Sequence, residues 1–166
     1  MAGALTRGVF FVHSAPKAMC PHVEWAVSNV LGVRVHCEWT PQPAARGLMR
    51  TELSWQGHQG TGAKVVSALR GWEQLRFEVT EDPSAGADGS RWSHTPSLGV
   101  FHAQMDVHGN IVVPEMRVRA AMEHSYDSYR MRRELDLALG TAWDEELEPF
   151  RYAGEGAPVR WLHQVG

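Results

Sequence analysis

The chain has 166 residues, a length that fits one domain able to bury about 70% of the surface that its unfolded form exposes. Such a domain needs neither a disulfide nor a metal ion to form a core. Its 16 basic and 19 acidic residues give a net charge of −3, and 43% of its residues are apolar. These values exclude a disordered tail and a globally basic nucleic-acid-binding protein. We therefore expect a single domain over residues 1–166 with no nucleic acid as partner.

We expect the first residues to carry no export signal, because the apolar run 9–12 is too short for one. No apolar run approaches the roughly 20 residues of a membrane span. The two cysteines, Cys20 and Cys37, are then expected to be free thiols in a cytoplasmic protein with no membrane partner. The composition also favours arginine over lysine, 14 to 2, and includes nine histidines and seven tryptophans, residue types common at sites and interfaces.

Residues 1–81 predict the order strand, helix, strand, strand, helix, strand from period-two alternation and from apolar stripes that end at a glycine. The strands are expected at 8–13, 33–40, 49–56 and 75–80, and the helices at 21–31 and, after a glycine-rich turn at 57–62, up to residue 69. This order is that of a ferredoxin-like βαββαβ unit, in which both helices cover one face of the sheet. The other face is expected to be solvated or covered by a later part of the chain. It would carry Arg34, His36, Glu38, Arg50, Glu52, Arg76 and Glu78.

Residues 82–98 are polar and rich in turn signals, and they predict a long loop of a length that is uncommon unless the loop binds something or moves. Residues 99–166 predict an added β-hairpin at 101–113, a helix opened by Pro114 and a second helix at 126–139. A short acidic helix that Pro149 ends and a C-terminal tail or strand complete the chain. We therefore expect an α+β domain with a ferredoxin-like first half, a hairpin and C-terminal helices.

The connection after the first strand holds four candidate catalytic residues, Cys20, His22, His13 and Ser14. They would lie at a strand end and a helix N-terminus, where the helix dipole lowers the pKa of a thiol and a histidine can accept its proton. Cys20 beside His22 is the best nucleophile candidate. The alternative is that Ser14 and Cys20 only cap and pack, and no orienting carboxylate is identifiable, so we assign no catalytic residue.

A candidate cofactor site is the glycine-rich turn with Gly60, Thr61, Gly62 and Lys64. Glycines let a phosphate approach the backbone amides of a helix N-terminus, and Lys64 would add positive charge. The turn is similar to the pyrophosphate loop of acetyl-CoA-dependent N-acetyltransferases, but it has Gly57 where that family has Gln or Arg. The alternative is a plain turn with Thr61 as the N-cap, so we assign no cofactor. Antiparallel pairing of the first and third strands would place this turn and the Cys20 rim at opposite ends of the sheet.

Three residues of the hairpin, His102, Asp106 and His108, lie at alternate positions that suit a metal ion in principle. No pair of Cys or His has the spacing of a zinc finger. An exposed strand face is the simpler explanation, and we assign no metal.

The tryptophans near element ends and the acidic C-terminal helix are candidates for a protein-binding surface. Aromatic residues at such positions are either interface anchors or partly buried core residues. The last helices begin with a basic run at 130–133 and continue with acidic residues, a pattern that fits either a solvated face with internal ion pairs or a docking surface. The candidate interaction residues are Trp25, Trp92, His94, Trp143, Glu145, Glu146 and Trp161.

Six runs of sequence resemble a known family, an actinobacterial domain of unknown function with the number 3145. They are VHSAP at 12–16, CPHVEW at 20–25, ALRGW at 68–72, RWSHTP at 91–96, AWDEELEPFRY at 142–152 and VRWLH at 159–163. The family has no established activity. The resemblance implies an actinobacterial source, which accounts for the excess of arginine, and a role beside type II fatty-acid synthesis.

Two hypotheses about function follow. The first is a non-catalytic binding or regulatory module with a protein partner, an enzyme of acyl-chain synthesis, docked on the tryptophans and the acidic helices. The second is a small acyl-CoA-dependent acyltransferase or thiol-dependent enzyme that uses residues 60–64 for the cofactor phosphates and Cys20 or His22 for chemistry. The sequence leaves the identity of the partner and the oligomeric state open.

Overall fold

The computed structural model describes residues 3–151 and contains helices together with one antiparallel sheet, so the domain is α+β as expected. The sheet has seven strands in the order β2-β3-β1-β4-β5-β6-β7, and every neighbouring pair is antiparallel. The strands are β1 (Leu5–Pro16), β2 (Thr40–Pro41), β3 (Leu48–His58), β4 (Arg76–Glu81), β5 (Gly89–Thr95), β6 (Gly99–Met105) and β7 (Ile111–Val112).

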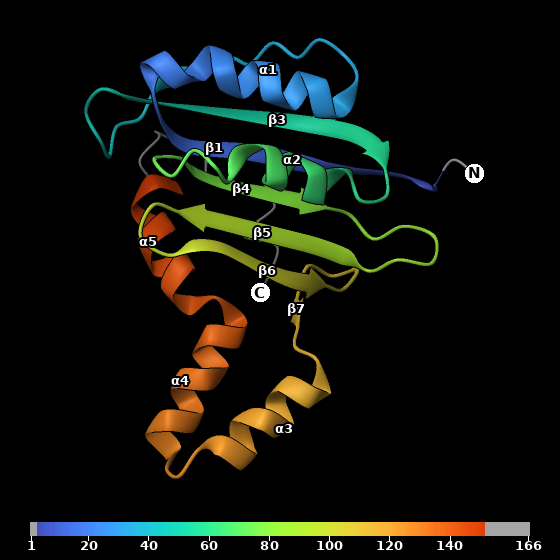
Figure 1. Ribbon diagram of the computed structural model, residues 1–166, viewed down its shortest axis with the longest axis vertical. Coiled ribbons are helices and arrows are strands. Elements are labelled where there is room, and N and C mark those ends of the chain that lie inside the picture. Colours follow the sequence, from blue (N-terminus) through green and yellow to red (C-terminus); the bar gives the residue numbers. More distant parts are fainter. Residues whose placement is uncertain (1–2, 152–166) are drawn as a thin grey trace.

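Two helices cover one face of the sheet (Figure 1), α1 (Cys20–Leu31), which follows the short 3-10 turn η1 (Lys17–Met19), and α2 (Thr61–Leu69). Between these helices and the sheet lies the apolar core, in which Phe10, Val23 and Leu69 are fully buried. The apolar stripes predicted on both helices therefore face the sheet. The ferredoxin-like description of residues 1–81 stays a prediction, because β2 comprises only two residues.

Residues 33–40 were expected to form a strand, and this prediction is wrong for all but the last of them. Two side chains of α1 replace a neighbouring strand as hydrogen-bond acceptors. The Glu24 carboxylate accepts from the backbone N–H of Cys37 at 3.0 Å, and the Ser28 hydroxyl accepts from the N–H of Val35 at 2.9 Å. Because its amides bond to helix side chains, this segment runs along α1 instead of joining the sheet.

The prediction of a long loop at 82–98 is also wrong for its second half. Residues 89–95 form strand β5, which pairs with β4 on one side and with β6 on the other. Arg91, Ser93 and Thr95 alternate along β5 and are all buried. Polar residues at such positions suggest a loop, but here Arg91 and Ser93 bond to a buried glutamate, described below. Trp92 and His94, on the opposite face of β5, are buried as well.

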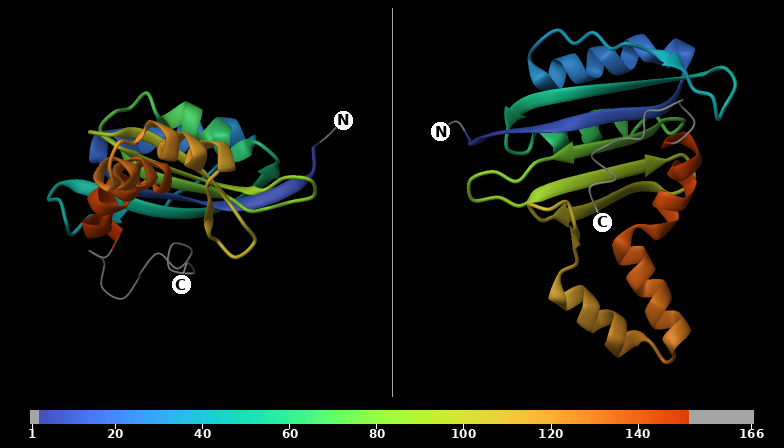
Figure 2. Two further views of the ribbon diagram at one scale, coloured as in Figure 1. Left: turned by 90° about the horizontal axis from the view of Figure 1, so that it is seen from below. Right: turned by 180° about the vertical axis from the view of Figure 1, so that it is seen from behind.

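Three C-terminal helices follow β7: α3 (Glu115–His124), α4 (Ser128–Leu139) and α5 (Thr141–Arg151). The helix α5 lies against the sheet face that α1 and α2 leave open (Figure 2), and it continues through Pro149, where its end was expected. The helices α3 and α4 form an arm that projects past the β6 edge of the sheet (Figure 1). Within residues 3–151, none of the helices has the length and apolar character needed to cross a membrane.

Candidate functional site

The face of the sheet beneath α5 holds a buried polar network centred on Glu78, whose side chain is fully buried. The Nε2 atom of His13 lies 2.6 Å from the Glu78 Oε2 atom, and the Arg151 Nε atom donates to the same oxygen at 3.1 Å. The other oxygen, Oε1, accepts from the Ser93 hydroxyl at 3.1 Å, from Arg91 at 3.4 Å and from Arg151 Nη2. Both carboxylate oxygens are therefore fully used within the chain.

A second carboxylate, that of Asp144 in α5, joins the same two arginines. Its Oδ1 atom accepts from Arg91 at 2.5 Å and from Arg151 at 2.9 Å. Nearby, the Gln42 amide donates to the backbone oxygens of His13 at 2.6 Å and Phe150 at 3.2 Å. The network thus connects α5 to β1, β4, β5 and the segment after β2.

Burial and the charges of neighbouring side chains set the protonation states in this network. Burial alone would raise the pKa of Glu78, but its contacts with His13 and Arg151 lower that pKa far below the ordinary value. Burial alone would lower the pKa of Arg151, but Glu78 and Asp144 raise it. Burial, together with Arg151 and Arg50, lowers the pKa of His13, so at neutral pH a neutral imidazole donates from Nε2 to an ionised Glu78.

This network holds α5 in place and offers no free base or nucleophile. A general base needs an acceptor atom that a substrate can reach, but both Glu78 oxygens are occupied and the His13 ring is completely buried. The Nδ1 atom of that ring has no partner among the described residues, and it too is buried. The arrangement therefore suits a structural role, attachment of the C-terminal helix to the sheet.

Acidification is expected to destabilise the protein in two stages. Because the folded pKa of His13 lies below its ordinary value of 6.5, the unfolded chain binds a proton near that pH before the folded chain does. Stability from this group is complete above about pH 6.5 and decreases as the pH falls. The lowered pKa of Glu78 adds a second loss of stability below the ordinary pKa of 4.5.

Urea unfolding at a series of pH values measures both stages. His13→Gln should reduce the first slope, and a free energy of unfolding that is flat between about pH 7 and 5 would contradict it.

The four candidate catalytic residues do not come together. His13 and Ser14 lie on the α5 side of the sheet, where the Ser14 hydroxyl accepts from Arg76 at 3.2 Å. Cys20 belongs to the core under α1, and its thiol donates to the Pro16 carbonyl oxygen at 3.7 Å. Burial raises the pKa of Cys20, the opposite of the lowering expected at a helix N-terminus. His22 is exposed. Because residues two positions apart on a helix point to different sides, His22 does not face Cys20.

The glycine-rich turn is closed by a side chain of the protein itself. Gly60, with φ of 90°, is the N-cap of α2, so the expected cap at Thr61 is wrong; the Thr61 hydroxyl donates to the His58 carbonyl oxygen instead. The Glu81 carboxylate accepts from the N–H groups of Gly60 at 3.0 Å and Gly62 at 2.9 Å. It occupies the position that a phosphate needs, and Lys64 is exposed to solvent.

The two candidate sites lie at opposite ends of the sheet, as expected. Leu5 pairs with His58 at one end of the β1–β3 ladder, and Pro16 pairs with Leu48 at the other. The turn before α2 follows His58, whereas the rim with Cys20 follows Pro16. One pocket therefore cannot contain both, as the acyltransferase hypothesis would need.

Removing the Glu81 carboxylate is expected to cost about 1–2 kcal/mol of stability, the usual effect of losing a helix N-cap acceptor. Glu81→Ala would leave the N–H groups of Gly60 and Gly62 without this partner. Urea unfolding measures the change. The neighbouring Asp82→Ala is the control, since it removes only an exposed ion pair with Arg7 and should cost less than about 1 kcal/mol. Equal effects of the two variants would contradict the capping role.

Two candidate interaction residues, Trp92 and His94, are buried and cannot anchor a partner, which corrects that prediction. The Trp92 indole packs on α2: a Cβ atom at Gly62 would lie 2.7 Å from it. The His94 ring stacks on Phe77 with centroids 4.9 Å apart, and its Nδ1 atom lies 2.7 Å from the Leu75 carbonyl oxygen. Both residues belong to the packing of β5.

The remaining interaction candidates differ in exposure. Trp25 is 66% exposed on α1 and Glu145 is exposed on α5. Trp143 holds α5 on β6, because its Nε1–H donates to the Gly99 carbonyl oxygen at 2.9 Å. Glu146 accepts from the Ser97 hydroxyl, which lowers the pKa of that carboxylate. Trp161 lies outside the described residues.

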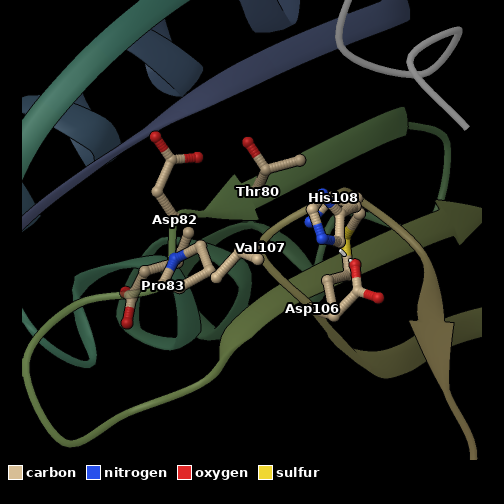
Figure 3. A pocket seen from close by; sticks show the side chains of 9 residues that line it. Thr80, Asp82, Pro83, Asp106, Val107 and His108 are labelled. Atoms are coloured by element: carbon tan, nitrogen blue, oxygen red, sulfur yellow. Dashed lines mark hydrogen bonds between the residues drawn. The ribbon is translucent and has the colours of Figure 1, made fainter.

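A surface pocket of about 390 Å³ lies between the turn after β4 and the hairpin turn after β6 (Figure 3). The Asp106 carboxylate shapes this turn by accepting from the backbone N–H groups of His108 and Asn110, both at 2.9 Å. Asp82, across the pocket, is paired with Arg7. The carboxylates of Asp82 and Asp106 in this pocket are therefore already bonded within the protein. Residues 3–151 contain no group of three or more His, Cys, Asp or Glu side chains placed to hold a metal ion, and His102 lies beside Ser90.

The model of a protein family described as "Protein of unknown function (DUF3145)" matches residues 9–164, which is almost the whole chain. The chain belongs to this family. Comparisons with curated proteins and with solved structures gave no significant match. Family membership therefore adds no activity to what the geometry shows.

The residues that this member of the family gathers around Glu78 were not found as a site in the sequence. Glu78 was expected on the open sheet face, and the possibility that a later segment covers that face was left open. No motif marks Arg91, Asp144 or Arg151 as its partners. Their side chains meet because β5 and α5 bring together residues 13 and 73 positions away from Glu78.

Proposed function

We propose that the protein is a non-catalytic binding module that docks an enzyme of acyl-chain synthesis on its helical arm, residues 115–139. The observation that carries the proposal is the exposed apolar surface of this arm. On α3, Met116 is 76% exposed and Met122 is 59% exposed, and at the tip Tyr126 is 91% exposed. Apolar side chains gathered on a projecting element are typical of a protein-binding surface.

The chemistry of these side chains suits a protein partner. Methionine is flexible and polarizable, and it is common on surfaces that pack against other proteins, while tyrosine is a frequent interface anchor. Charged residues flank the apolar ones, as at the rim of an interface, and Arg119 donates to Glu115 at 2.6 Å within α3. On α3, Ala121 is buried and Val118 is half-buried, and the other side chains of the helix are exposed.

The remaining polar groups support a non-catalytic role. The Glu78 carboxylate is saturated by Arg91, Arg151 and its other partners, and Glu81 occupies the N-terminus of α2. Burial raises the pKa of Cys20, which disfavours the thiolate. The choice of an acyl-chain enzyme as the partner rests on the family resemblance, which implies a role beside type II fatty-acid synthesis.

Site-specific photo-cross-linking in the source organism tests the proposal. A photoreactive amino acid replaces Met116, and the control places it at Val107, which is equally exposed at 77% but lies on the hairpin turn away from the arm. We expect position 116, and not position 107, to cross-link to an acyl-chain enzyme, and Met122→Glu to reduce the yield about tenfold. Equal yields at both positions, or no effect of Met122→Glu, would overturn the docking surface. A partner from another process would overturn the link to acyl chains.

A further inference from the structure

One face of α4 carries a stripe of side chains that is complementary to itself. The stripe consists of Tyr129, Arg132, Asp136 and Leu139, whose spacing of three, four and three residues places them along one side of a helix. Tyr129 is 72% exposed and Leu139 is 42% exposed. Apolar residues thus stand at both ends, with a basic and an acidic residue between them.

The stripe borders a hollow that α4 forms with the start of α5. This hollow has a volume of about 460 Å³. It is lined from α4 by Tyr129, Arg132, Arg133, Asp136 and Leu137, and from α5 by Thr141, Ala142 and Glu145. Another side of α4 packs within the protein, because Ala138 is buried and Met131 and Leu135 are half-buried. Arg130 and Glu134 are exposed and line a separate depression shared with α3. The stripe is therefore the side of α4 that is open to a partner.

We propose that a second copy of this chain docks on the stripe, with the two α4 helices antiparallel around a two-fold axis near residue 134. In that arrangement Arg132 of each copy faces Asp136 of the other, and Tyr129 of each copy faces Leu139 of the other. A two-fold interface forms each contact twice, so both charges and both apolar ends are matched. A parallel arrangement would instead place Arg132 against Arg132, which is repulsive.

The charge order along the helix points to the same arrangement. The first half of α4 carries Arg130, Arg132 and Arg133, whereas the second half carries Glu134 and Asp136, and Glu145 adds negative charge to the hollow. An antiparallel neighbour brings a basic half against an acidic half at both ends. A surface that needs no other protein to complement it fits a copy of itself.

The inference deepens the proposed function, since it rests on the same arm being a docking element. The acyl-chain partner uses α3 and the tip of the arm, and the second copy uses the stripe on α4. The dimer would therefore present two α3 surfaces to partners. Because the two surfaces differ, substitutions can separate them.

Sedimentation velocity and light scattering of the full chain over a wide concentration range test the dimer. We expect a mass of about twice 18.5 kDa for the unaltered protein. Arg132→Asp or Asp136→Arg should weaken the dimer about tenfold or more, because each places like charges together twice. The double variant R132D/D136R should restore the dimer with the charges exchanged. The control is Arg130→Asp, the same change in charge on the same helix but outside the stripe, which should weaken the dimer far less than Arg132→Asp does.

Several results would overturn the inference. They are a monomer at every concentration, a dimer that Arg132→Asp does not weaken, and a double variant that stays monomeric while its circular dichroism matches that of the unaltered chain. Failure of this inference and failure of the proposed function are distinguishable. A monomeric protein that still cross-links through position 116 refutes only the dimer, and a dimer without that cross-link refutes only the acyl-chain partner.

Discussion

Replacing Glu78 with glutamine is expected to lower the free energy of unfolding by about 3–5 kcal/mol, the usual effect of removing one member of a buried ion pair. Glutamine is nearly the same size, so packing is conserved and the lost charge dominates. Arg151 and Arg91 would remain buried with Asp144 and the half-exposed Glu148 to balance them. The glutamine amide also cannot accept the hydrogen bonds of a carboxylate at both ends.

Urea unfolding at neutral pH measures this effect, with Glu52→Gln as the control. Glu52 is a strand glutamate on the same sheet, two strands from Glu78 across β1, but its side chain is exposed, so its replacement should change stability by less than about 0.5 kcal/mol. Arg151→Met combined with Glu78→Gln should cost less than the sum of the single changes, because it removes an unpaired charge. A loss below about 1 kcal/mol for Glu78→Gln would show that Asp144 and Glu148 suffice to balance the arginines.

Replacing Gly8 with alanine is expected to cost about 3 kcal/mol, at the upper end of what overpacking a core does. A Cβ atom at this position would lie 1.8 Å from the Thr80 carbonyl oxygen and 2.6 Å from the Trp55 indole. A contact with backbone cannot be relieved by a rotamer change, so β1 or β4 must move. Since β1 lies between β3 and β4 in the sheet, a shift of β1 would disturb its pairing with both strands.

Thermal and urea unfolding of Gly8→Ala measure the cost, and Gly71→Ala is the matched control. A Cβ atom at Gly71 would have no other atom within 4 Å, so the control should stay within about 0.5 kcal/mol of the unaltered protein. If Gly8→Ala were as stable as this control, the close approach of β1, Thr80 and Trp55 would be wrong.

Alternation and glycine stops were reliable guides where a segment packs against its neighbours in the ordinary way. The strands β1, β3 and β4 and both sheet-covering helices lie close to where their patterns predict them. Gly32 and Gly140 end α1 and α4 with φ of 69° and 74°, a left-handed conformation that favours glycine. These patterns depend on neighbouring residues alone, so they predict helices and strands without knowledge of the tertiary structure.

The two errors in secondary structure, at 33–40 and 82–98, share one physical cause, which is hydrogen bonding to side chains that are not sequence neighbours. Residues 33–39 alternate like a strand, but Glu24 and Ser28 of α1 accept from their amides. Arg91 and Ser93 suggest a loop because they are polar, yet Glu78 makes their burial favourable. In both cases the partner that decides the outcome is not adjacent in the sequence.

The α+β class follows from local patterns in the sequence, because the periods of its apolar residues and its helix-ending glycines depend only on near neighbours. The sequence also placed Cys20 and the Gly60 turn at opposite ends of the sheet, since that follows from antiparallel pairing. The roles of the polar residues, by contrast, depend on which segments meet in the folded chain. Whether Glu78 is a solvated carboxylate or the centre of a buried network depends on α5 folding back over the sheet, and no local pattern contains that information.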